Sequence, residues 1–94
     1  MIQIQFSQSA VADLQRLRDF IAASNEEAAA RVALRIRESI GTLALFPAKG
    51  RPVENIEGVR ELVAGNYVVR YLHREPEEQI VILRIWHGKE YRNL

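Results

Sequence analysis

The sequence predicts an α+β fold in the order β-α-α-β-β-β, with a two-helix antiparallel hairpin packed on a mostly antiparallel four-stranded sheet. The first observation behind this prediction is a strictly alternating apolar segment near the amino end, Ile2 to Phe6, which is typical of a short strand. The second is a pair of long segments with helical periodicity, separated by about two residues. The third is a carboxy-terminal part in which β-branched apolar runs alternate with short turn sequences.

The first helix is predicted from Gln8 to Ala23, directly after the strand. Ser7 precedes it and can accept a hydrogen bond from an amide of the first turn, as N-cap serines do. Apolar residues at helical spacing define its expected buried face, which comprises Ala10, Leu14, Leu17 and Ile21, widened by Val11 and Phe20. We expect the opposite, solvated side to carry Asp13, Arg16 and Asp19.

The second helix is predicted to begin at the capping box Ser24-Asn25-Glu26-Glu27, in which Ser24 accepts from the amide of Glu27. Glu27 and Arg31 are expected to form an i,i+4 pair on its solvated side. We expect Pro47 to end this helix, because the residue before a proline avoids the helical region. The predicted buried face comprises Ala29, Val32, Ala33, Ile36, Ile40 and Leu43.

A long loop is predicted from Pro47 to Gly58, because this stretch contains prolines and glycines and little periodicity. Long loops in compact domains are often functional. This one contains Lys49-Gly50-Arg51, two cations that flank a glycine. The loop is therefore either part of a binding site or an ordinary solvated turn.

Three consecutive strands are predicted at residues 59–63, at residues 67–72 and from residue 79 onward, and the short turns between them indicate an antiparallel meander. His73 falls in the second turn, where we expect a solvated residue. If Leu72 pairs with Ile80, one sheet face carries Arg70, Arg84 and Trp86. The other face, toward the helices, then carries Val69, Tyr71, Val81, Leu83 and Ile85. A shift of one residue would exchange the two faces.

The last strand leads without a linker into the segment from Arg84 to Arg92, which contains three cations, a histidine, a tyrosine and the only tryptophan. A strand that ends in such a cluster carries polar side chains to the edge of the sheet on a rigid support, as binding and catalytic sites often require. A core strand followed by a solvated tail would produce the same sequence. The local pattern leaves both interpretations open.

Composition predicts one domain, residues 1–94, without disulfides or thiolate metal sites, because the chain has no cysteine. The sequence shows no signal peptide and no apolar run long enough to cross a membrane, so we expect a cytoplasmic protein with no membrane contact, metal or cofactor. The net charge is only +1, and this argues against a non-specific nucleic-acid binder. A local basic pocket remains compatible with that balance.

The order of elements resembles the RelE/ParE family of bacterial toxins from type II toxin–antitoxin modules. The resemblance covers nearly the whole chain and depends on the order of several short pieces. These pieces are Ala10, Asp13-Leu14 and Leu17, then Asn25, Ala28-Ala29 and Arg31, then Leu43, Pro47 and Gly50-Arg51, then Gly58 to Leu62, Tyr67 to Tyr71, and Ile82 to Gly88. It implies an antitoxin partner, with which the chain would form a hetero-oligomer.

The resemblance implies one of two activities. ParE-like members bind and inhibit DNA gyrase, whereas RelE-like members enter the ribosome and cut messenger RNA. The near-neutral charge and the ending Trp86-His87-Gly88-Lys89 favour the gyrase-directed activity. The alternatives are the ribosome-dependent ribonuclease, and a partner-binding module without toxicity.

The candidate site residues differ between these activities. RNA cleavage needs proton-transfer groups and cations for the phosphorane. If the chain is RelE-like, the catalytic candidates are therefore Arg60, Arg84, His87 and Tyr91. The candidate binding residues are Lys49, Arg51, Arg60, Arg70, Arg84, Trp86, His87, Lys89 and Tyr91. Whether the chain is an enzyme depends on which activity it has.

Overall fold

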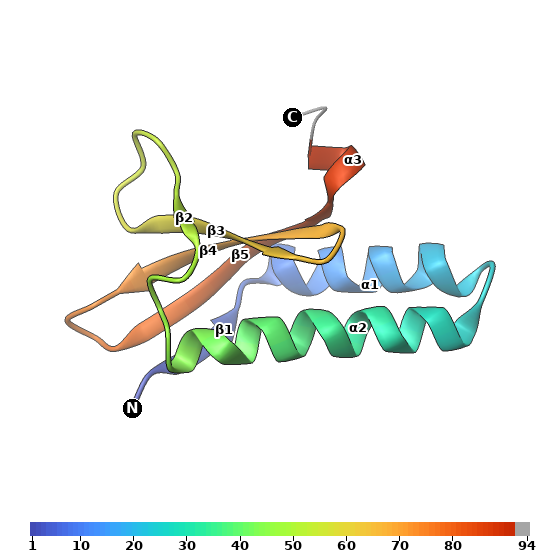
Figure 1. The fold of residues 1–94 in the computed structure, drawn as a ribbon, viewed down its shortest axis with the longest axis horizontal. Coiled ribbons are helices and arrows are strands. Elements are labelled where there is room, and N and C mark those ends of the chain that lie inside the picture. The colour runs from blue at the N-terminus through green and yellow to red at the C-terminus, as the bar shows by residue number, and fades with distance from the viewer. Residues whose placement is uncertain (92–94) are drawn as a thin grey trace.

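The computed structural model describes residues 1–91 and has two layers, a helical hairpin and a mixed sheet (Figure 1). The hairpin covers one face of the sheet, and a short carboxy-terminal helix lies at the other face (Figure 1). The elements are β1 (Gln3–Phe6), α1 (Gln8–Ala22), α2 (Glu26–Gly41), a 3-10 turn (Thr42–Ala44), β2 (Arg51–Pro52), β3 (Val59–Ala64), β4 (Tyr67–Arg74), β5 (Gln79–His87) and α3 (Gly88–Tyr91). The predicted α+β class and element order are confirmed.

The sheet has five strands in the order β1-β5-β4-β3-β2, so the prediction of four strands was wrong. The additional strand, β2, consists of Arg51 and Pro52 inside the predicted loop and pairs with β3. Two residues, one of them a proline, give no periodic pattern from which a strand could be predicted. β1 is parallel to β5 because the helical hairpin carries the chain back across the sheet, and the other pairs are antiparallel.

The first helix is capped as predicted, and the second is capped one residue later. The Ser7 hydroxyl accepts from the amide of Ala10 at 3.0 Å, and the Asn25 side chain, not Ser24, accepts from the amide of Ala28 at 3.0 Å. α2 ends at Gly41, directly before the 3-10 turn, and not at Pro47 as predicted. Within residues 1–91, no helix is long and apolar enough to cross a membrane.

The buried face of α1 differs from the predicted one at three positions. Val11 and Phe20 are 55% and 80% exposed, whereas Asp13 is only 3% exposed. The predicted Glu27–Arg31 pair is present at 4.0 Å on the solvated side of α2. The core between the layers comprises Ala10, Leu17, Ile36, Ile40, Leu43, Leu62, Val69, Tyr71, Ile80, Ile82 and Ile85.

The register of β5 contains an irregularity that the sequence did not reveal. Arg70 lies opposite Arg84 and Tyr71 lies opposite Ile82, so Leu83 has no partner and forms a bulge. The extra residue reverses the alternation of faces along β5. Ile80 and Ile82 are therefore the buried residues, and the prediction that Val81 and Leu83 face the helices was wrong. Beyond the bulge the predicted faces of Arg84, Ile85 and Trp86 are correct, and His73 belongs to β4 and not to a turn.

Tyr71 ties the long loop to the core. Its hydroxyl donates to the Pro47 carbonyl at 2.7 Å and accepts from the Gly50 amide at 2.9 Å, although the side chain is fully buried. Gly50 must be a glycine at this close approach, since a Cβ atom there would lie 2.7 Å from the Tyr71 hydroxyl. The loop that carries Lys49 and Arg51 is thus fixed at its base.

Candidate functional site

The face of the sheet away from α1 and α2, called the outer face below, carries a cluster around the only tryptophan. The guanidinium carbons of Arg70 and Arg84 each lie 5.1 Å from the centre of the Trp86 ring. The ring of Tyr91, at the end of α3, lies 5.6 Å from Trp86 at a tilt of 55°. These neighbours leave Trp86 only 5% exposed. We call Glu61, Arg70, Arg84, Trp86 and Tyr91 the tryptophan cluster.

Glu61, on β3, holds one side of the cluster together. It accepts from Arg70 at 2.7 and 2.9 Å, and from the Tyr91 hydroxyl at 2.6 Å. The hydrogen bond to Glu61, together with burial, raises the pKa of Tyr91. Sequence reasoning missed Glu61, although the β3–β4 register places it directly opposite Arg70.

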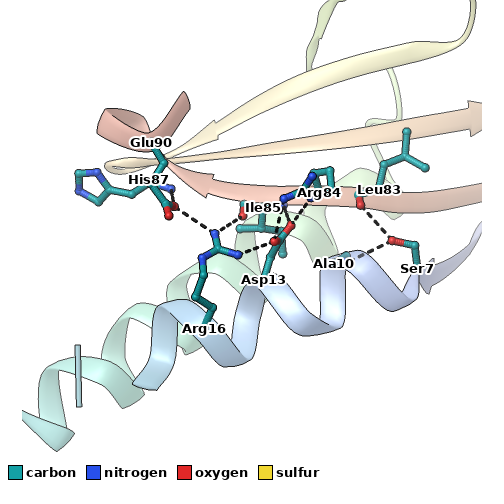
Figure 2. Close-up of polar contacts among 9 residues, drawn as sticks. All are labelled: Ser7, Ala10, Asp13, Arg16, Leu83, Arg84, Ile85, His87 and Glu90. Carbon is teal, nitrogen blue, oxygen red and sulfur yellow. Dashed lines mark hydrogen bonds and ion pairs between the residues drawn. The ribbon is translucent and has the colours of Figure 1, made fainter. Parts of the chain in front are cut away.

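Asp13, on α1, holds the other side of the cluster (Figure 2). Its carboxylate accepts from Nε and Nη2 of Arg84 at 2.7 and 3.1 Å, and from the Ile85 amide at 2.8 Å. Arg16 donates to the same carboxylate. Burial opposes ionisation of Asp13, but these hydrogen bonds outweigh it and lower the pKa of the carboxyl. The sequence placed Asp13 on a solvated face, and this was wrong because α1 crosses the end of β5.

Arg16 extends this network to the carboxy-terminal helix α3. It donates to Glu90 at 3.1 Å, and Glu90 also accepts from the His87 amide at 3.0 Å (Figure 2). Burial opposes ionisation of Glu90, but its bonds with the His87 amide and with Arg16 lower the pKa of the carboxyl. α3 is therefore attached to α1 through Glu90 and to β3 through Tyr91.

His87 lies on the helix-facing side of the sheet, not with the tryptophan cluster. It pairs with Tyr67, which packs against the core, and the two rings meet edge to face at 5.2 Å. Its Nδ1 accepts from the Lys89 amide at 3.0 Å. Strand alternation explains the position, because His87 directly follows Trp86 along β5.

Arg60 also lies on the helix-facing side, opposite Tyr71. Its guanidinium donates to the carbonyls of Ala48 and Gly50 at 3.3 and 2.8 Å, and so supports the backbone of the long loop. The four catalytic candidates of a ribonuclease, Arg60, Arg84, His87 and Tyr91, are thus distributed over both faces of the sheet.

The outer face continues from the tryptophan cluster into a groove of about 400 Å³. Lys49 and Arg51 line it together with Glu61 and Tyr91, and Val63 on its floor is 67% exposed. The Lys49 ammonium donates to the Thr42 hydroxyl at 3.3 Å. Of the remaining predicted cations, Lys89 is exposed on α3, and Arg92 lies outside the described residues.

A second, larger groove of about 580 Å³ lies beside α1, α2 and β1, and we call it the hairpin groove. Its walls are mostly apolar, and two arginines stand among them. The lining residues are Ile4, Phe6, Val11, Leu14, Gln15, Arg18, Ala33, Arg37, Ile40 and Gly41. The groove therefore gathers apolar side chains of α1, α2 and β1, with two guanidiniums among them, in one concave surface.

The structure thus brings Arg70, Arg84, Trp86 and Tyr91 together and places Lys49 and Arg51 beside them. Two guanidiniums and a phenol, held in fixed positions around an indole that is only 5% exposed, suit contact with a protein surface, where arginine and tyrosine are among the residues that contribute most of the binding energy. Among residues 1–91, no three histidine, aspartate or glutamate side chains are arranged to hold a metal ion.

These features define a small α+β protein that offers a rigid aromatic–arginine surface on its sheet and an apolar groove beside its helices. The chain belongs to the family described as the ParE toxin of type II toxin–antitoxin systems, parDE, whose sequence pattern it matches over residues 4–91. The predicted membership of the RelE/ParE family is thereby confirmed.

Individual relatives agree with this assignment. The chain is 36% identical to Toxin RelE2 of Caulobacter vibrioides over 85 residues, which cover 89% of this chain and 94% of that protein. Its fold is similar to a chain in the structure of the chromosomal ParDE system from P. aeruginosa, with a TM-score of 0.77 at 26% identity over 93% of this chain and 96% of that one. It is also similar to a chain in the toxin–antitoxin complex RelBE2 of Mycobacterium tuberculosis, with a TM-score of 0.62 at 27% identity over 92% and 96%.

Proposed function

We propose that this toxin inhibits DNA gyrase by binding it through the outer face of the sheet, and that a cognate antitoxin neutralises it. The observation that carries the proposal is the pairing of both cluster arginines with carboxylates of the same chain, Arg70 with Glu61 and Arg84 with Asp13. A surface built to grip RNA phosphates gains from unpaired cations, whereas these carboxylates would repel phosphate.

The positions of the proton-transfer candidates also argue against a ribonuclease. A general base and a general acid must both reach one reacting phosphate. His87 and Tyr91 lie on opposite sides of the sheet, and the Tyr91 hydroxyl is engaged with Glu61. The protein-binding interpretation needs no such convergence, because a buried aromatic platform with arginines on it is a common anchor in protein interfaces.

In this proposal the antitoxin occupies the hairpin groove. The solved relatives from P. aeruginosa and M. tuberculosis are described as toxin–antitoxin systems or complexes. In this chain the groove runs along two helices and the exposed edge of β1, and Arg18 and Arg37 line it. An amphipathic helix with an apolar stripe flanked by carboxylates would complement both features. The antitoxin would then bind the chain on the side opposite to the tryptophan cluster.

Two assays on the purified toxin test the proposal, namely supercoiling by purified gyrase and messenger cleavage on programmed ribosomes. We expect inhibition of supercoiling and intact message. Trp86→Ala should weaken inhibition about tenfold or more, as loss of an interface anchor does. His87→Ala should retain most of it. Phe20→Ala is the control for loss of an aromatic ring elsewhere, because Phe20 lies on α1, is 80% exposed and is not part of the tryptophan cluster.

The opposite outcome is equally specific. Cleaved message with gyrase unaffected, and activity abolished by His87→Ala, would establish the RelE-like ribonuclease instead. General acid–base catalysis contributes about 10²–10⁴-fold, so the loss would be unmistakable. If neither assay responds and cells tolerate the chain without an antitoxin, the protein is a partner-binding module without toxicity.

A further inference from the structure

The starting observation is how β5 is completed at its outer edge. β1 pairs with β5 only as far as Ile82. Beyond that point, side chains form hydrogen bonds with the backbone amides and carbonyl at the free edge of β5 (Figure 2). Ser7 donates to the Leu83 carbonyl at 2.9 Å, Asp13 accepts from the Ile85 amide at 2.8 Å, and Glu90 accepts from the His87 amide at 3.0 Å.

Asp13 does more than complete this edge. Among residues 1–91 it is the only buried charged side chain. Besides the Ile85 amide, its two oxygens accept hydrogen bonds from Arg16 and Arg84. Satisfying the Ile85 amide would need only a neutral acceptor, such as asparagine. The additional requirement for a negative charge comes from Arg84, which binds the carboxylate through two nitrogens in a fixed geometry.

The Arg84 side chain contacts both the outer face and the helical layer. It stacks over Trp86 on the outer face and reaches round the open edge of β5 to Asp13 on α1. A free arginine side chain has many rotamers of similar energy, so an unrestrained Arg84 would not stay in one position over the ring. Arg70 is restrained in the same way by Glu61 from β3. Two carboxylates from different layers therefore fix the two arginines on Trp86.

We propose that Asp13 is a positioning residue for target recognition, because it sets the place of Arg84 on Trp86 and thereby the shape of the outer face. The inference depends on the proposed function, in which that face binds the target. Asp13 does not contact the target in this proposal. It acts from the helical layer through Arg84, just as Glu61 acts through Arg70.

The chain contains a single tryptophan, so its fluorescence reports directly on the cluster. The test compares Asp13→Asn, Arg84→Gln and the double variant, with Asp19→Asn as the matched control. Asp19 lies on the same helix and is exposed, and its carboxylate accepts only from Gln15 among the described residues. We expect acrylamide to quench Trp86 more strongly in both single variants. The double variant should be quenched no more than Arg84→Gln, because Arg84→Gln already removes the guanidinium that Asp13 holds over the ring.

Binding supplies the functional measurement. Asp13→Asn and Arg84→Gln should each reduce gyrase inhibition by about tenfold, as expected when an arginine anchor is lost. Affinity for the antitoxin should change by less than about threefold, because hairpin-groove contacts do not include Asp13. If Asp13→Asn matches Asp19→Asn in quenching and inhibition and differs only in its urea midpoint, Asp13 is merely structural and the inference is wrong.

If Asp13→Asn does not fold, Arg84→Gln decides, since it leaves the Ile85 and Arg16 bonds of Asp13 intact, and unchanged quenching in that variant would overturn the inference. If the wild-type chain does not inhibit gyrase, the proposed function fails. The quenching comparison still shows whether Asp13 positions Arg84, so the two failures can be told apart.

Discussion

Replacing Tyr71 by phenylalanine removes one oxygen atom from the centre of the molecule and should destabilise it markedly. The hydroxyl makes two hydrogen bonds, to the Pro47 carbonyl and from the Gly50 amide, and the ring is fully buried. Phenylalanine would keep the ring and its packing. The change therefore isolates the attachment of the long loop to the core.

The expected magnitude follows from these two bonds. Losing the bond to the Pro47 carbonyl costs about 1 kcal/mol, and the buried Gly50 amide left without its acceptor costs about 1–3 kcal/mol. Because Gly50 is buried, its amide cannot turn to water unless the loop moves. We expect the free energy of unfolding to fall by about 2–4 kcal/mol. With a urea dependence of about 1 kcal/mol per molar for so small a domain, the midpoint should fall by about 2–4 M.

The matched control is Tyr67→Phe, in which the same atom is removed from the same strand. Within residues 1–91 the Tyr67 hydroxyl makes no hydrogen bond, so this variant should stay within about 0.5 kcal/mol of the wild type. Urea melts followed by circular dichroism measure both. Equal midpoints for the two variants would refute the idea that Tyr71 fixes the loop. Limited proteolysis should also cut residues 47–52 faster in Tyr71→Phe alone.

Other predictions follow from the same structure. Gly50→Ala should destabilise at least as strongly as Tyr71→Phe, because its Cβ would lie 2.7 Å from the Tyr71 hydroxyl; a variant that melts like wild type would contradict the close approach. Ile36→Ala should cost about 2–5 kcal/mol, whereas Leu34→Ala, a similar truncation at a 58% exposed position of the same helix, should cost under about 0.5; equal urea midpoints would overturn the helix faces. Folding lowers the pKa of the Asp13 carboxyl, so ionised Asp13 stabilises the fold fully above the unfolded pKa of about 3.9, and this stabilisation is lost as the pH falls below that value. The urea midpoint of the wild type should therefore decline steeply below about pH 4, and the urea midpoint of Asp13→Asn should decline less steeply.

Periodicity was enough to predict the order of elements, because each helix and each long strand buries one continuous face. The bounds of α1 were predicted to within one residue, and Ser7 was correctly identified as its cap. The N-cap of α2 was predicted wrongly because two residues with good capping side chains, Ser24 and Asn25, are adjacent. Helix geometry decides such a choice, and a sequence pattern does not contain it.

The candidate site was predicted less completely. Arg70, Arg84 and Trp86 were correctly expected on one face, although the predicted pairing of Leu72 with Ile80 was wrong. Leu72 pairs with Val81, and the bulge at Leu83 shifts the register so that Arg84 still lies opposite Arg70. Asp13 and Glu61 were not expected there, although they fix both arginines. A lone charged residue in a helix is usually solvated, so burial of Asp13 could not be predicted before the position of α1 across β5 was known.

The bulge at Leu83 explains how one strand can serve both the core and the outer face. In a regular strand, Ile82 and Arg84 would point to the same side, so either the core would receive a guanidinium or the core would lose Ile82. The unpaired Leu83 reverses the alternation, so Ile82 and Ile85 both point into the core while Arg84 and Trp86 point outward. Ser7 donates to the Leu83 carbonyl at 2.9 Å while it caps α1, and this couples the bulge to the start of the helix that carries Asp13 (Figure 2). The residue that begins the helical layer thus also fixes the point at which β5 turns its charged and aromatic side chains toward the outer face.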